Sequence, residues 1–175
     1  PGDDDNDGGY TNMYLAGLSL QYAVTKDESV RQRAKQIFKA IAFLEEVTEL
    51  PGFIARTVVP AEWTQVRDSN EEISQQRRIL MRVQDPRYKP VEVRWRKSRD
   101  GKWLWKGDTS SDEITAHFFG WAIYYDLCAD NKDRQTLKSL VSRVMDKIIA
   151  DGYVLKDIDG THTRWGVWAP ERLKH

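Results

Sequence analysis

Two aspartates stand just before two long stretches of sequence that are almost free of charge. Asp7 precedes residues 8–25, and Asp112 lies close before residues 114–128. Acidic residues are common at the N-caps and first turns of helices, so both can simply mark helix starts. Two carboxylates on either side of one sugar linkage are also what glycoside hydrolysis requires, one as acid and the other as base or nucleophile. Asp7 and Asp112 therefore predict either two helix starts or a pair of catalytic carboxylates.

The second of these stretches contains a histidine, His117, four residues after Glu113. A histidine one turn into an apolar helix is most simply explained as a core residue whose hydrogen bonds are satisfied. The alternative is a general base, because an imidazole near its working pKa removes a proton at neutral pH. Tyr10 and Asn12, on the first uncharged stretch, are its expected neighbours, and plain packing explains Tyr10 equally well.

Two arginines and two tryptophans could hold a substrate. Arg56 and Arg164 each follow a predicted helical hairpin, and Trp165 and Trp168 lie in a glycine-containing segment that we expect to be a loop. A planar guanidinium binds a carboxylate or sulfate with two hydrogen bonds, whereas its ordinary role is a salt bridge or a helix cap. Indole rings in a loop either pack against it or stack on sugar rings.

The acidic start of the chain imitates a calcium-binding loop. Asp3, Asp5, Asp7 and Gly8 fit its first six positions, but the twelfth is Tyr14 where a bidentate glutamate is needed. A solvated acidic end is the better explanation, so no metal site is expected beyond this weak match. The sequence also contains no nucleotide P-loop, no GxSxG motif and no HExxH motif.

The elements that must position these residues are helices. Residues 8–25 carry no charge, and residues 114–128 carry only Asp126 and the neutral His117, so we expect two helices that are buried on all sides. Residues 30–45 and 137–148 alternate apolar and charged positions at helical spacing, which predicts an amphipathic helix after each buried one.

Start and stop signals support this order. Thr25 with Glu28, and Ser110 with Glu113, have the spacing of capping boxes. The Leu-Pro-Gly triplet at 50–52 is expected to close the second helix, and Gly152 to close the fourth.

Alternating helix directions predict a shared rim. If the buried helices run one way and the amphipathic helices run back, the starts of the former and the loops after the latter lie at one end of the molecule. Helix N-termini would favour anions there. The residues expected at this rim are Asp5, Asp7, Tyr10, Asn12, Arg56, Asp108, Asp112, Glu113, His117, Arg164 and Trp165.

Residues 61–105, between the two hairpins, form a basic insertion that contains tryptophans. Its end predicts a β-hairpin, with alternating residues at 91–95, a turn at Asp100-Gly101 and a return strand at 103–105. Residues 67–90 are expected at the surface, with a short helix around 71–82. Interleaved basic and aromatic residues bind single-stranded nucleic acid or an acidic glycan, although a solvated loop is the default explanation.

Composition and net charge limit the class of protein to which this chain can belong. The chain has 175 residues, 40% of them hydrophobic, and a formal net charge of +0. This excludes a disordered tail and a disulfide miniprotein, and it gives no overall attraction to nucleic acid or anionic membrane. Cys128 is the single cysteine and is expected to be buried. We recognise no targeting segment in these residues, which fits either a cytosolic protein or a chain that has been processed; of the two, we expect a secreted or extracellular location.

Three segments carry a resemblance to a known class. Residues 5–14, 106–119 and 160–170 resemble uncharacterised proteins of the α/α-toroid, six-hairpin glycosidase-like class. Residues 11–14 also align with 115–118 at a shift of 104 residues, which indicates repeated hairpins. The resemblance implies a ring of helical hairpins with a carbohydrate-binding funnel, and both hydrolases and polysaccharide lyases occur in the class. A full ring needs many more helices than this chain supplies.

We therefore expect residues 1–175 to form a mainly α domain, a partial toroid of antiparallel helical hairpins with a small β-hairpin insertion. It is either a fragment of a larger toroid or an arc that closes by self-association. The expected partner is an acidic polysaccharide or oligosaccharide, with no membrane, nucleic acid or cofactor.

The expected function is binding and cleavage of that glycan. As a lyase, Arg56 or Arg164 would neutralise a uronate and His117 or Tyr10 would remove the neighbouring proton; as a hydrolase, Asp112 and Asp7 would act. Asn12, Asp108, Glu113, Trp165 and Trp168 complete the expected substrate-binding set. The alternative is a non-catalytic binding or assembly module that uses the basic insertion.

Overall fold

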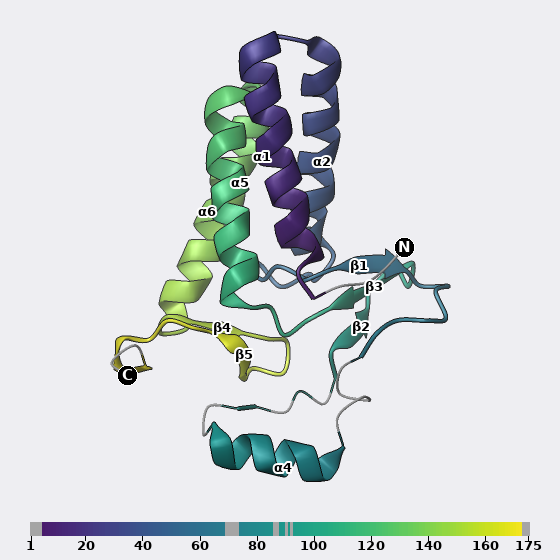
Figure 1. The fold of residues 1–175 in the computed structure, drawn as a ribbon, viewed down its shortest axis with the longest axis vertical. Coiled ribbons are helices and arrows are strands. Elements are labelled where there is room, and N and C mark those ends of the chain that lie inside the picture. Colours follow the sequence, from purple (N-terminus) through teal and green to yellow (C-terminus); the bar gives the residue numbers. More distant parts are fainter. Residues whose placement is uncertain (1–4, 69–73, 86–87, 90, 92, 173–175) are drawn as a thin grey trace.

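The protein is mainly α-helical, as predicted. The computed structural model describes residues 5–68, 74–85, 88–89, 91 and 93–172 (Figure 1). The long helices of this part are α1 (Asp7–Thr25), α2 (Glu28–Glu46), α5 (Ser111–Leu127) and α6 (Asn131–Ala150). A shorter helix, α4 (Gln75–Gln84), lies at the end of the molecule away from the α1–α2 turn, and a 3₁₀ turn spans Pro170–Arg172.

Polar side chains cap the starts of three long helices. Asp27 and Asp130 each accept a backbone N–H of their own first turn at 2.8 Å, at the starts of α2 and α6. Ser110 accepts the N–H of Glu113 at 3.3 Å at the start of α5, so this half of the predicted capping box is confirmed. Each cap satisfies a backbone donor that a helix start otherwise leaves without a partner.

The predicted capping box at Thr25 is wrong. Thr25 is the last residue of α1, and its hydroxyl donates to the Gln21 carbonyl at 2.9 Å. Asp27 stands directly before α2 and provides the cap instead. At the far end of α6, Gly152 follows the last helical residues with φ +76°, as predicted for a glycine that closes a helix.

The four long helices pack around one apolar core. Phe38 of α2 stacks on Tyr124 of α5 with ring centroids 4.9 Å apart. An ion pair between Glu45 and Arg143, with Oε1 and Nε 2.7 Å apart, joins α2 to α6 at the edge of this core. The most deeply buried apolar side chains of the helices are Leu15, Ala34, Phe38, Ile41, Trp121, Tyr124, Leu137, Leu140 and Val144.

Glycines allow α1 and α5 to lie in close contact. A Cβ on Gly8 would stand 2.0 Å from Glu113 Oε1, and a Cβ on Gly120 would stand 2.7 Å from both Oδ1 and the carbonyl oxygen of Asn12. The Glu113 side chain accepts the Gly9 N–H at 2.9 Å. The second half of the predicted capping box is therefore wrong, because this carboxyl group caps the start of the neighbouring helix.

The prediction that these two helices are buried on all sides is also wrong. Tyr10 is 63% exposed and Val24 is 86% exposed on α1, and Phe119 is 53% exposed on α5. The prediction was based on the lack of charged residues in both helices, whereas only one side of each helix faces the core. Among the described residues, no helix combines the length and hydropathy needed to cross a bilayer.

Two small antiparallel sheets lie at the lower end of the bundle. Strands β1 (Val58–Pro60), β2 (Trp95–Lys97) and β3 (Trp103–Lys106) pair in the order β1-β3-β2. The predicted hairpin at Asp100-Gly101 is thus confirmed as β2–β3, although its first strand begins only at Trp95. Strand β1 was not predicted from the sequence.

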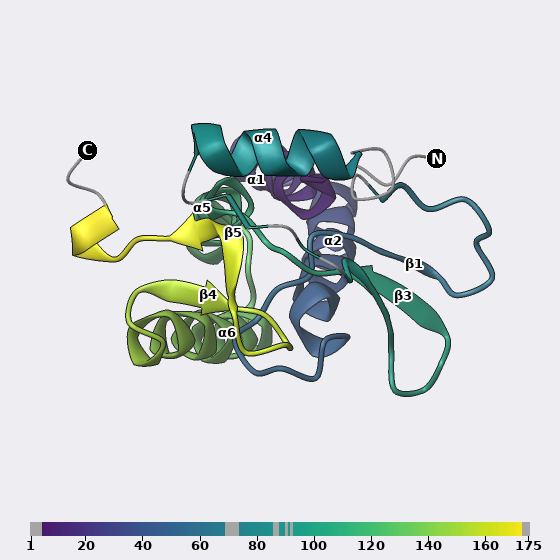
Figure 2. The ribbon, with the colours of Figure 1, turned by 90° about the horizontal axis from the view of Figure 1, so that it is seen from below.

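The second sheet replaces a predicted loop. Strands β4 (Val154–Lys156) and β5 (His162–Val167) form an antiparallel pair, so Trp165 lies on a strand and the loop prediction is wrong. Seen from below, β4–β5 lies over the end of α6 and β1–β3 beside α2 (Figure 2).

The predicted short helix in the insertion is α4. It covers Gln75–Gln84, whereas the prediction began at residue 71, and residues 71–73 lie outside the described residues. Ser74 caps it by accepting the Arg77 N–H at 3.3 Å. No residue of α4 is buried, so the helix lies on the surface as expected.

Replacing Gly8 by alanine should lower the free energy of unfolding by at least about 2 kcal/mol, because the methyl group cannot fit beside the Glu113 carboxyl group. Gly17→Ala is the matched control, since a Cβ there meets nothing within 4 Å. That change should stabilise α1 by up to about 1 kcal/mol. Denaturant unfolding of both variants at one protein concentration tests this, and equal effects would contradict the close packing of α1 on α5.

Candidate functional site

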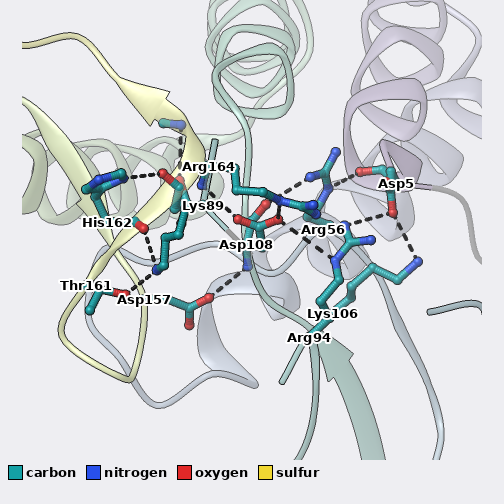
Figure 3. Close-up of polar contacts among 12 residues, drawn as sticks. Asp5, Arg56, Lys89, Arg94, Lys106, Asp108, Asp157, Thr161, His162 and Arg164 are labelled. Atoms are coloured by element: carbon teal, nitrogen blue, oxygen red, sulfur yellow. Dashed lines mark hydrogen bonds and ion pairs between the residues drawn. The ribbon is translucent and has the colours of Figure 1, made fainter. Parts of the chain in front are cut away.

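The predicted meeting of the two helix starts with the loops after α2 and α6 is confirmed. Arg56, which follows α2, and Arg164, which lies on β5 after α6, both contact Asp108 (Figure 3). The Arg56 Nη1 donates to the Asp108 carbonyl oxygen at 2.9 Å, and the Arg164 Nε donates to Asp108 Oδ2 at 2.7 Å. Residues more than 100 positions apart thus share one end of the bundle.

Asp108 is the centre of this end of the molecule. Its side chain is fully buried and its backbone is left-handed, with φ +57°. Besides the Arg164 side chain, its carboxylate accepts the Arg164 N–H at 2.8 Å and has Arg94 Nε at 3.9 Å. Its own N–H donates to Asp157 Oδ2 at 2.8 Å. A buried carboxylate is tolerated because these partners compensate its lost hydration.

Asp5 joins the N-terminal segment to the same cluster. Its Oδ1 lies 3.0 Å from Arg94 Nη2 and 3.3 Å from Lys106 Nζ, and its carbonyl oxygen accepts the Arg56 Nε–H. Partial burial opposes ionisation, but the charges of Arg56, Arg94 and Lys106 outweigh it and lower the pKa of Asp5. The Arg56 guanidinium also donates to Asn6 Oδ1 at 3.1 Å. Its hydrogen bonds therefore fix the N-terminal segment against the loop that follows α2.

The calcium match is not supported by these contacts. Asp3 lies outside the described residues, and Asp5 Oδ1 already faces two cationic side chains. Within the described ranges, no group of three or more His, Cys, Asp or Glu is placed to hold a metal ion.

We call this cluster the basal network. In the part of the chain that the structure describes, it contains the cations Arg56, Arg94, Arg96, Lys106 and Arg164 and the carboxylates Asp5, Asp108 and Asp157.

His117 is enclosed between the helices. It is fully buried, its Nδ1 donates to the Glu113 carbonyl oxygen at 2.8 Å, and its ring meets Trp121 edge-on with centroids 5.1 Å apart. Burial lowers the pKa of His117 to about 4, so the ring is neutral at pH 7. It lines none of the hollows described below. The general-base role stays a prediction, and in this position the ring contacts none of those three hollows.

Glu113 is also kept neutral. Burial raises its pKa to about 8, although the Gly9 N–H favours the carboxylate form. Its Oε1 and the His117 Nε2 are buried without a hydrogen-bond partner among the described residues. These two predicted site residues therefore act in the contact between α1 and α5.

The other residues predicted for catalysis, Tyr10, Asp7 and Asp112, and Asn12 of the predicted substrate-binding set lie in different places. Tyr10 is on the outer face of α1, and Asn12 is buried with its Nδ2 donating to the Gly8 carbonyl oxygen at 2.9 Å. Asp7 lines a hollow of about 160 Å³ beside α2, whereas Asp112 lines another on the outer face of α1 and α5. The structure does not bring Asp7 and Asp112 into one hollow.

A larger hollow, of about 620 Å³, lies between β4–β5 and the segment that ends α4. We call it the β4–β5 hollow. Trp165 is half exposed in its wall, and Arg164 lies next to it. Trp168 is not part of it and packs against the core. The residues that line the hollow are Arg82, Asp85, Tyr88, Lys89, Asp151, Gly152, Val154, His162, Arg164, Trp165, Val167, Ala169 and Glu171.

Most of these residues were not predicted as site residues. Arg82, Tyr88 and Lys89 belong to the basic insertion, and composition was the signal that singled them out. What the sequence did not indicate is that the insertion reaches β5. Lys89 Nζ donates to the His162 carbonyl oxygen at 2.6 Å and to the Thr161 hydroxyl, which joins the two segments (Figure 3).

Comparisons with protein-family models, curated proteins and solved structures found no match to this chain.

The Glu113 and His117 pKa values predict how stability depends on pH. A carboxyl group with a raised pKa in the folded state stabilises the fold only while it is protonated, so its effect falls between its ordinary pKa of 4.5 and about 8. The lowered pKa of His117 works in the opposite sense between about 4 and 6.5, where stability rises with pH. The net loss should therefore appear between pH 6.5 and 8, on the order of 2 kcal/mol.

Denaturant unfolding at these two pH values measures this loss, and Glu113→Gln should remove most of it. An equal loss in that variant would assign the pH dependence to other groups.

Replacing Asp108 by asparagine tests the basal network. Asparagine tolerates the left-handed backbone and keeps the shape, but it removes the carboxylate that pairs with the largely buried Arg164 and lies 3.9 Å from Arg94 Nε. We expect the free energy of unfolding to fall by about 3 kcal/mol. Glu28→Gln, which breaks an exposed pair with Arg31, should change it by no more than about 0.5 kcal/mol. Similar losses in both variants would contradict a central role for Asp108.

Proposed function

We propose that this chain binds an acidic saccharide in the β4–β5 hollow. The volume of about 620 Å³ is within the usual range for small-molecule sites, roughly 300 to 1,000 Å³. The observation that carries the proposal is the half-exposed Trp165 ring in the wall of this hollow, which also contains the exposed Arg82. The aromatic face offers a stacking surface for a sugar ring, and the Arg82 guanidinium offers a partner for its acidic group.

A buried hydroxyl in the wall supports the same conclusion. Tyr88 is 6% exposed, and its hydroxyl has no hydrogen-bond partner among the described residues. An unpaired buried hydroxyl is costly, and a ligand hydroxyl in the hollow would relieve that cost. Saccharides present many such groups at short intervals.

Among the described residues, the wall of the hollow contains the cations Arg82, Lys89 and Arg164 and the acids Asp85, Asp151 and Glu171. Arg164 connects the hollow to the basal network through its ion pair with Asp108. Asp151, an acid of the wall, is paired with Lys147 at 3.0 Å and with Lys156 at 3.3 Å, so two lysines offset its charge. Arg82 adds an exposed cation at the end of α4.

Binding without cleavage fits these positions best. A lyase or a hydrolase needs its acid and base beside the bound linkage. His117 is enclosed, and Asp7 and Asp112 line other hollows. The proposal therefore follows the alternative of a binding module to which the basic insertion contributes. The toroid arrangement stays a prediction that the resemblance alone carries.

Variants of the hollow test the proposal by retention on immobilised polygalacturonate, with a neutral glucan for comparison. Trp165→Ala and Arg82→Ala should each weaken binding about tenfold, through loss of stacking and of a charge-assisted hydrogen bond. Both side chains are exposed, so the fold should be unchanged. Arg33→Ala, an exposed arginine of α2 far from the hollow, is the matched control and should bind like the parent.

Retention should decrease with added salt, because the contact is partly ionic. No retention on any uronate-containing polysaccharide would refute the proposal, and so would equal losses in all three variants. The same incubations report cleavage: a rise in ultraviolet absorbance from unsaturated uronate would show elimination, and new reducing ends without it would show hydrolysis. Either result would replace binding by catalysis as the function of the hollow.

A further inference from the structure

The outer side of α1 and α5 is an apolar surface that nothing in the described chain covers. Its exposed members recur at three- and four-residue steps along α1 and meet α5 where Met13 lies beside Phe119. We call it the outer face, and its large side chains are Tyr10, Met13, Tyr14, Leu20, Val24 and Phe119. Contiguous apolar surfaces of this kind mark sites of protein association.

The outer face carries almost no charge. Between Asp7 and Lys26, α1 has no charged residue, and on α5 the only exposed charges lie near its ends, at Asp112 and Asp126. Cores of protein interfaces are depleted of charge and enriched in tyrosine, phenylalanine and methionine, which is the composition found here. A charged partner would gain no ion pair in the middle of this face.

A hollow on the face can receive a side chain. It measures about 580 Å³ and is lined by Met13, Ala116 and Phe119 together with Ser111, Asp112 and Thr115. Large aromatic side chains that enter such hollows supply much of the binding energy in interfaces. Tyr10 and Tyr14, on the same face, are aromatic residues of this kind.

We propose that the outer face binds the outer face of a second copy of this chain. An uncharged surface is complementary to another uncharged surface, and self-contact brings no like charges together at its centre. The helices are about 28 Å long. With a width of roughly 20 Å for two helices side by side, each copy buries roughly 600 Å², the lower end for specific interfaces. The proposal thus specifies a reversible, two-fold symmetric dimer.

Sedimentation equilibrium of the full chain over a concentration series measures the association. The parent should show a monomer–dimer equilibrium. Because a two-fold contact places the same residue twice in one interface, Met13→Arg and Met13→Glu should each weaken it at least about tenfold. Met13 is exposed, so neither change should alter the circular dichroism spectrum or the thermal midpoint.

Ile149→Arg is the matched control, an exposed apolar residue on α6 that should associate like the parent. A parent that stays monomeric throughout the series overturns the proposal, and so does association that survives Met13→Arg. Equal weakening in Ile149→Arg would assign the contact to another surface.

Discussion

A fully buried carboxylate, that of Asp108, joins the two halves of this protein at the end of the helix bundle that also holds the sheets. Asp108 lies between the loop after α2 and the strand after α6, and it holds Arg164 through the side chain and Arg56 through the backbone. Neither arginine could be buried here without such a partner, because an unpaired charge away from water is strongly unfavourable. The position of β5, and with it the β4–β5 hollow, depends on this contact. Trp165 is the next residue after Arg164.

The second constraint is the close contact of α1 with α5. Glycines at the crossing leave room for the Glu113 carboxyl group, which stays neutral and caps the start of the neighbouring helix. The polar groups of Glu113 and His117 therefore stabilise the contact between these two helices. The opposite sides of the same helices remain apolar and exposed, which is the surface we assign to a second copy. One arrangement thus explains both the enclosed histidine and the open face.

Periodicity predicted the helices well because a helix is a local structure whose repeat is written in neighbouring residues. The amphipathic stretches that became α2 and α6, the Asp100-Gly101 hairpin and the glycine after α6 were found in this way. The sheet β4–β5 was missed, because its short strands pair irregularly and carry polar and aromatic residues that also occur in loops. The contact of Lys89 with β5 could not be predicted from local sequence patterns, since it joins residues 73 positions apart.

Local residue patterns were enough to predict a mainly helical chain with two hairpins of alternating direction, and from that the shared end where Arg56, Asp108 and Arg164 meet. Which of the candidate side chains reach solvent depends on how the helices and sheets pack. A helix pattern records which positions are apolar, but an apolar position becomes buried only if another element covers it. For the same reason His117 and Trp165, both plausible site residues in the sequence, ended in opposite surroundings: one inside the α1–α5 contact and one in the wall of a hollow.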